Sequence, residues 1–342
     1  MKALLLTLMA SVAAAGVAVL PLVSYSSGSG LLYGAILHAG PEGVEGPEIS
    51  VMAYGTARGG QYESFGVRIP VGGGAWFASA CHEQLLNHDF FGWGNWGDPD
   101  ESLEYDRESD VISIGHTRTF GPFEARAGAE ARHSSVFDRE EGDLWGSLPD
   151  RPLTNGWTAG PSVELSSRSY PGPAWGNLRA RFDWQGGGGK AYWRTELERT
   201  ACHPIGGGFL LALRNDVAYH HGAGDTQIPF LPFLGPAQLL REYAGDRFSG
   251  DWLTVANLEL RRRLFGLMDD PETDDPLILV GAALFADAGQ ASETLSGMRW
   301  DRWHPDGGIG FYATLRGMTL RVDAALLSPE GFRLNMRIGG GF

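Results

Sequence analysis

Long stretches of this sequence alternate between apolar and polar residues with a period of two. In 123–132, phenylalanine and alanine occupy the odd positions, and charged residues occupy four of the five even ones. The segments 177–184 and 332–338 alternate in the same way. Successive side chains of a β-strand point to opposite faces, so this period predicts strands between an apolar and a polar environment. A soluble sandwich with its apolar face inside would alternate in the same way, because the pattern does not show which face points outward.

Counting these segments predicts sixteen strands. The first is short, at 20–25, and the others lie at 30–39, 48–57, 60–70, 74–86, 106–119, 122–135, 155–168, 175–185, 189–200, 208–220, 251–265, 276–290, 304–315, 317–327 and 331–341. Many of these strands have the length of about 10 residues that crosses a bilayer, and bacterial single-chain barrels have an even strand number. We therefore predict an all-β fold, a sixteen-stranded transmembrane antiparallel β-barrel.

The chain begins with the layout of a secretory signal. Met1-Lys2 precedes an apolar run at 3–12 and small residues at 13–16, which predicts cleavage near Ala15 or Ala18. We expect a signal peptide at 1–18, a barrel at 19–342, and no periplasmic domain ahead of the first strand. A retained helical anchor is the alternative reading of the apolar start. An exported chain with no further apolar run can enter the outer membrane of a Gram-negative-type bacterium by closing a sheet.

The connections between the predicted strands differ in length. Long ones follow odd-numbered strands, at 87–105, 136–154, 221–250 and 291–303, whereas short ones at 120–121 and 201–207 follow even-numbered strands. Outer-membrane barrels keep their long loops outside, so this pattern predicts which end of the barrel faces the exterior. The acidic link 269–275 is longer than this rule predicts.

Charge and motifs exclude several classes of function. The 342 residues have a formal net charge of -14, which argues against a nucleic-acid partner. His82 and His88 lack the i, i+4 spacing of a zinc-protease helix, and 186–190 lacks the spacing of a phosphate-binding loop. The sequence has no Gly-x-Ser-x-Gly motif. We therefore predict no enzymatic activity, no metal and no cofactor.

The stretch 230–289 contains the strongest candidate site. The loop 221–250 includes Leu240-Arg241-Glu242-Tyr243, and Glu259 and Asp287 lie on the polar faces of the two strands that follow. A guanidinium binds carboxylates through two parallel hydrogen bonds. We expect the loop to enter the barrel, with Arg241 near both acids. In the alternative, the loop packs outward as a lid and Arg241 meets solvent or lipid headgroups.

These residues resemble a known family, the bacterial surface antigens or BamA/TamA-like outer-membrane barrels of assembly and two-partner secretion. In that family the sixth outer loop folds into the lumen, and the arginine of its tip reaches an acid in a Phe-x-Asp-x-Gly strand. The matching positions here are Leu240, Arg241, Tyr243, Phe285, Asp287 and Gly289. Glu242 stands where the family has glycine. The segment 90–95 and the C-terminal Phe342 are also similar to family features.

The resemblance implies a role in membrane assembly: insertion of outer-membrane proteins, or translocation of polypeptide or lipid. The implied partners are outer-membrane lipid and client polypeptides or a separate periplasmic protein. The chain looks like a barrel-only branch of the family. A passive diffusion channel or structural barrel without an assembly role remains the alternative.

The two ends of the chain should meet at a weak seam. We expect closure between 20–25 and 332–342, where the candidate residues are Phe332, Gly339, Gly340, Gly341 and Phe342. Glycines remove side chains that would pack and stiffen the last strand. Any lateral opening is therefore expected at this seam.

Overall fold

The structure is a computed structural model. It describes residues 16–26, 30–41, 46–95, 97–98, 100–148, 155–168, 175–234, 240–241, 243, 245–269, 276–315, 318–327 and 330–339. The predicted signal peptide at 1–18 thus lies outside the described residues except for 16–18. Val17 and Ala18 belong to the first strand, Val17–Ser26, which is longer than the predicted 20–25.

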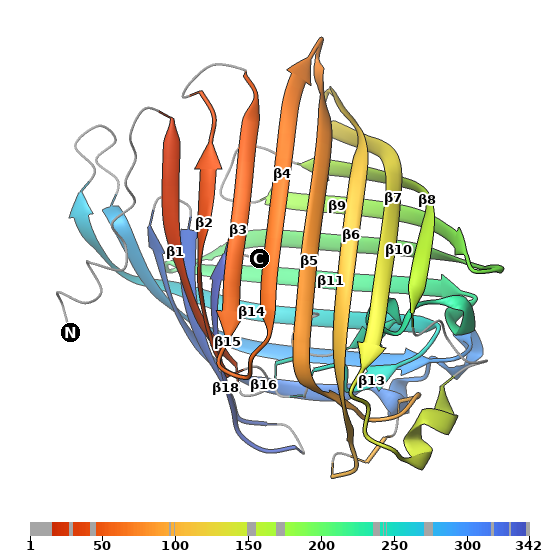
Figure 1. Ribbon diagram of the computed structural model, residues 1–342. Coiled ribbons are helices and arrows are strands. Elements are labelled where there is room, and N and C mark those ends of the chain that lie inside the picture. Colours follow the sequence, from red (N-terminus) through yellow and green to blue (C-terminus); the bar gives the residue numbers. More distant parts are fainter. Residues whose placement is uncertain are drawn as a thin grey trace.

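Sixteen antiparallel strands form a closed barrel (Figure 1). They are β1 (Val17–Ser26), β2 (Gly30–Ala39), β3 (Glu48–Thr56), β4 (Gln61–Val71), β5 (Gly74–Phe90), β6 (Leu103–Phe120), β7 (Phe123–Phe137), β8 (Gly156–Arg168), β9 (Trp175–Gly187), β10 (Lys190–Gly206), β11 (Phe209–His221), β14 (Trp252–Asp269), β15 (Pro276–Ser292), β16 (His304–Leu315), β17 (Met318–Ala325) and β18 (Arg333–Gly339). Each strand pairs with its neighbours in this order, and β18 pairs with β1. The predicted all-β, sixteen-stranded barrel is confirmed.

The two ends of the barrel differ in the length of their connections. Two-residue turns at 72–73, 121–122 and 207–208 join strands at one end, and the loops 91–102 and 222–251 lie at the other. In Figure 1 the strands β3 to β7 cross in front of β9, β10, β11 and β14, as tilted strands on opposite walls of a barrel do. The loop 222–251 carries two short strands of its own, β12 (Phe233–Leu234) and β13 (Phe248–Ser249), which pair with each other.

The structure shows which face points outward. Large apolar side chains such as Ile112, Ile114 and Phe311 are exposed on the outer surface, whereas Asp183 and Asp323 are fully buried. An apolar exterior around a polar interior is the arrangement that lipid requires. None of the helical segments in the described ranges has the length and apolar character of a membrane-crossing helix.

Some strands run further than their alternation predicts. β5 continues to Phe90 and β6 begins at Leu103, beyond the expected limits of 86 and 106. Polar residues such as His88, Asp89 and Glu104 occur in these extensions. In β5 the period of two is interrupted by a shift of register between Leu85 and His88, where Asn87 has a φ of 52°.

The seam between β1 and β18 is short. Among the described residues, two pairs join the strands, Tyr25 with Met336 and Ser26 with Asn335, whereas ten pairs join β1 to β2. Of the expected seam residues, Phe332 precedes β18 and is exposed, and Gly339 pairs with β17. Gly340, Gly341 and Phe342 lie outside the described residues. The described seam contacts therefore lie in the middle of β18, away from its glycines.

Candidate functional site

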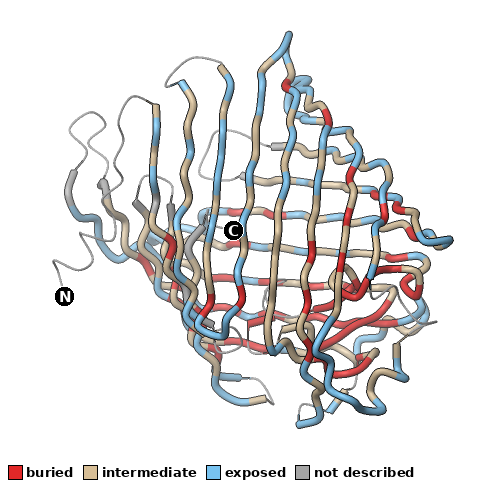
Figure 2. The backbone as a smooth tube through the Cα atoms, in the orientation of Figure 1, coloured by how far each residue is buried: buried red, intermediate tan, exposed pale blue. Residues whose placement is uncertain are grey.

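The loop 222–251 folds into the barrel and packs on the inner wall of β14 and β15. Leu240, Tyr243 and Phe248 of the loop form one buried cluster with Leu253, Val255 and other residues of the wall. In Figure 2 the buried residues gather toward the lower part of the barrel, where the loop lies. Removing these apolar side chains from water offsets the entropy lost when a long loop becomes ordered.

Arg241 is the centre of the site. Its guanidinium pairs with Glu259, and its Nε lies 3.4 Å from Asp287 Oδ2 and 3.7 Å from Asp323 Oδ2. The guanidinium carbon lies 4.2 Å from the centroid of the Phe285 ring, which gives it a cation–π contact. Only 2% of the arginine is exposed. The structure thus places Arg241 beside both acids named from the sequence and excludes the outward lid.

Further arginines surround the same acids. Glu259 Oε2 accepts hydrogen bonds from Arg261 Nε and Arg321 Nη1, both at 2.7 Å. Asp323 accepts from Arg321 Nε at 2.7 Å and from Arg337 Nη2 at 3.0 Å. We name these side chains and Arg241 with Asp287 the arginine network, which links the loop to β14, β15, β17 and β18. A buried charge is stable only when it is paired and hydrogen-bonded, and the network meets that need for Glu259 and Asp323.

Sequence reasoning missed the β17 and β18 members of this network. Arg321 and Asp323 stand two residues apart in 317–327, and Arg337 stands on the polar face of 331–341. The alternation of each strand indicates that Arg321, Asp323 and Arg337 face the lumen. It did not indicate which of the many lumen charges would meet the loop.

The backbone of the loop tip is also held. Asn335 Nδ2 donates to the carbonyl oxygen of Arg241 at 2.6 Å, and Tyr243 Oη donates to the carbonyl of Pro305 at 3.1 Å. Leu240 lies directly on Gly289, where an added Cβ would come within 2.8 Å of Leu240 Cδ1. Gly289 therefore makes room for the tip. Glu242 lies outside the described residues.

The segment 90–95 meets the inserted loop from β5. Gly94 N donates to Ser249 Oγ at 2.8 Å, and Ser249 N donates to the carbonyl of Gly94 at 3.1 Å. Asn95 Oδ1 accepts from Ala291 N at 2.8 Å, and its Nδ2 donates to the carbonyl of Arg302 at 3.0 Å. The two segments most similar to the family thus contact each other.

An ion pair and a histidine–carboxylate contact hold the return of the loop. Arg247 Nε lies 2.5 Å from Glu330 Oε1, and His88 Nε2 lies 2.6 Å from Asp246 Oδ2. Burial alone would raise the pKa of Asp246, but His88 and Arg107 together hold that pKa below its ordinary value. The negative charge of Asp246 therefore favours the docked loop.

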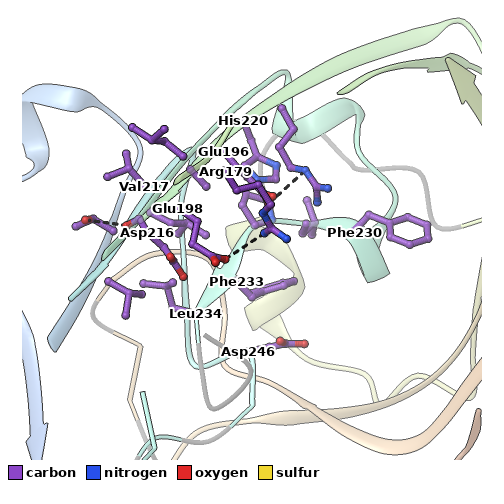
Figure 3. A pocket seen from close by; sticks show the side chains of 18 of the residues that line it. Arg179, Glu196, Glu198, Asp216, Val217, His220, Phe230, Phe233, Leu234 and Asp246 are labelled. Atoms are coloured by element: carbon purple, nitrogen blue, oxygen red, sulfur yellow. Dashed lines mark hydrogen bonds and ion pairs between the residues drawn. The ribbon is translucent and has the colours of Figure 1, made fainter. Parts of the chain in front are cut away.

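A cavity of about 430 Å³ lies between the loop and the wall formed by β9, β10, β11 and β14. Figure 3 shows its charged wall and the apolar loop side chains Phe230, Phe233 and Leu234. On the wall, Glu198 Oε2 lies 3.2 Å from Arg179 Nη2 and 3.3 Å from Arg214 Nη2. The inserted loop leaves space inside the barrel on this side.

Comparison with solved structures defines the class of fold, the β-barrel of BamA and CdiB, and confirms the predicted resemblance at that level. BamA from Haemophilus ducreyi lacking POTRA domains 1–3 is 14% identical, with a TM-score of 0.63 over 95% of this chain and 71% of that chain. CdiB from Acinetobacter baumannii is 14% identical, with a TM-score of 0.62 over 94% of this chain and 59% of that chain. CdiB from Escherichia coli is 12% identical, with a TM-score of 0.65 over 97% and 64%. The chain thus spans less than two thirds of either CdiB. No family model and no curated protein sequence matches the chain.

Proposed function

We propose that the protein is an outer-membrane barrel that inserts polypeptides into the membrane at the seam between β1 and β18. The observation that carries this proposal is the length of the seam in the part of the chain that the structure describes, two residue pairs against seven between β17 and β18. Each backbone hydrogen bond contributes about 0.5–1.5 kcal/mol net, so this interface costs least to open. An opened seam presents unpaired N–H and C=O groups, which can template an incoming strand.

The inserted loop is connected to this seam. Asn335 faces Ser26 across the seam and also donates its side-chain hydrogen bond to the loop tip at Arg241. A displacement of the loop tip would break that hydrogen bond and free the Asn335 side chain. In the proposed function, the arginine network sets the position of β18 while β1 moves.

The proposal also assigns a location and partners. The barrel would lie in the outer membrane of a Gram-negative-type bacterium, surrounded by lipid along its apolar exterior. Its clients would be outer-membrane polypeptides, and a separate periplasmic protein could deliver them. Translocation of polypeptide or lipid through the same opening is the related activity.

Cysteine cross-linking across the seam tests the proposal. In a variant whose native Cys81 and Cys202 are replaced by serine, Tyr25→Cys with Met336→Cys should form a disulfide that blocks function. The matched control links the same position of β18 to its other neighbour, Val322→Cys with Met336→Cys, and should leave function intact. Function is measured as the abundance of folded outer-membrane proteins after depletion of the wild-type copy. A locked seam with unchanged client abundance would contradict the proposal.

A passive channel is the competing function, and the cavity beside the loop is the observation in its favour. Depletion would then leave outer-membrane protein abundance level, while the purified barrel would conduct ions in planar bilayers. The same depletion strain therefore separates the two functions.

A further inference from the structure

A row of polar side chains crosses three strands on the outer face of the barrel. His82 of β5 pairs in register with Asp110 of β6, and Asp110 pairs with His133 of β7. In the neighbouring outward row, Ala80 pairs with Ile112, which is 50% exposed. The polar row is therefore the first one beyond the apolar surface on this part of the wall, toward the end with the long loops.

An aromatic side chain marks the same level. Trp157 of β8 pairs in register with His133, and the two rings lie 5.0 Å apart between centroids. Trp157 is 52% exposed. Tryptophans with this exposure are typical of the boundary between hydrocarbon and headgroups. The row thus lies at the outer membrane–water interface, where ions from the exterior can reach it.

The ligand atoms in this row converge. His82 Nδ1 lies 2.9 Å from Asp110 Oδ1, and His133 Nδ1 lies 3.4 Å from Asp110 Oδ2. Glu108 lies two residues from Asp110 on the same strand face, and one ligand atom each from His82, Glu108 and Asp110 lie within 4.8 Å of one another. His82 and Asp110 remain about one third exposed.

We infer that His82, Glu108 and Asp110 bind a divalent transition-metal ion, and that His133 positions Asp110. One imidazole and two carboxylates are ligands that Zn²⁺ takes at about 2.0–2.2 Å, with water in a fourth position. In such a tetrahedral site the ligand atoms lie about 3.3 Å apart, whereas here they lie within 4.8 Å of one another. Rotation of the Glu108 side chain would bring its carboxylate to the shorter distance. The imidazole selects Zn²⁺ over Mg²⁺ and Ca²⁺, which prefer oxygen ligands alone. The pair rejected above, His82 with His88, is not involved, because His88 binds the inserted loop.

In the alternative, the same side chains only hydrogen-bond to one another, with the two histidine rings donating to Asp110. That arrangement leaves Glu108 without a function in the row. It also predicts that Zn²⁺ at low concentration neither binds with a defined stoichiometry nor competes with protons at neutral pH.

Calorimetric titration with ZnCl₂ tests the site on the full barrel, purified in detergent without a polyhistidine tag. We expect one Zn²⁺ per chain at pH 7. His82→Ala and Asp110→Asn should weaken binding by at least about tenfold, and His133→Gln should weaken it by about 10–100-fold, the usual effect of losing a residue that orients a ligand. The matched control is His116→Ala, since His116 lies on the same outward face of β6, near Trp76. It should bind Zn²⁺ like the wild type.

Two further measurements keep the test independent of folding. Each variant is first shown to be folded by its heat-modifiable migration on gels. Co²⁺ is then used as a probe, and the wild type should give the intense visible bands of a four-coordinate site, which His82→Ala should lose. Unchanged Zn²⁺ stoichiometry in the His82 and Asp110 variants would overturn the inference. Equally tight binding of Ca²⁺ would also overturn it, because it would assign the site to the carboxylates alone.

Discussion

Replacing Arg241 by methionine should release the loop tip while leaving the barrel wall folded. Methionine keeps an unbranched apolar stem but removes the charge that faces Glu259, Asp287 and Asp323. Loss of one partner from a buried ion pair costs about 3–5 kcal/mol. The lower end applies here, because Glu259 keeps Arg261 and Arg321, and Asp287 keeps the hydrogen bond from Asn257 at 2.8 Å.

A cost of about 3 kcal/mol corresponds to an increase of about 100-fold in the undocked population of the loop. Hydrogen exchange measures this population through amides whose hydrogen bonds join the loop to the segment 90–95. Ser249 N donates to Gly94 O, and Gly94 N donates to Ser249 Oγ at 2.8 Å. In the Arg241→Met variant these amides should exchange about 100-fold faster, whereas the amides of β14 should keep their protection.

The matched control is Arg299→Met. Arg299 pairs with Asp301, but both side chains are more than half exposed, so water screens the pair. Exchange in the loop should remain as in the wild type. Equal exchange rates in the Arg241 variant and the wild type would refute the reasoning, since the arginine network would then not hold the loop.

Two other changes act on the same loop. Gly289→Ala should destabilise docking by about 1–3 kcal/mol, because the added Cβ would overlap the buried Leu240; limited proteolysis should cut the loop faster, Gly146→Ala, where a Cβ meets nothing within 4 Å, should have no effect, and unchanged cleavage of the Gly289 variant would contradict this overlap. Burial and the charge of Glu293 raise the pKa of Asp251 to about 6. Ionised Asp251 therefore destabilises the docked loop, and this free-energy cost is absent below about pH 4 and complete above the raised pKa. Exchange at 248–252, corrected for intrinsic rates, should therefore be faster at pH 7.5 than at pH 5, with a smaller difference after Glu293→Gln; an unchanged pH response would show that Asp251 does not couple to the loop.

The strands were predictable because each crosses one sharp boundary between lipid and a polar interior. The segment 304–315 is β16 as predicted, and 175–185 differs from β9 by two residues at one end. Where the strands rise beyond the boundary, as at 87–90 of β5, the alternation disappears, because the register shifts between Leu85 and His88 and Phe90 packs in an apolar cluster with the loop residue Ile228. The strand ends there are set by pairing with β6, which a local pattern does not report.

The site was predictable in its centre and not in its surroundings. Arg241, Glu259 and Asp287 stood out through the combination of strand parity and family resemblance. Arg321 and Asp323 join them only because the barrel curves β17 toward β14, a contact between segments 62 residues apart in the case of Arg321 and Glu259. The outward row at His82 depends likewise on register between strands, which alternation alone leaves open.

The short seam also has a consequence for how the chain folds. Most of the other strand pairs join neighbours along the chain through short connections, so each can form as a local hairpin with a small loss of loop entropy. Tyr25 and Met336 lie 311 positions apart in the sequence (336 minus 25), and their strands are joined by two pairs among the described residues. Ring closure should therefore be the last and most reversible step of folding. The protein would pass, at the end of its own assembly, through the same open-edged state in which we propose that it receives its clients.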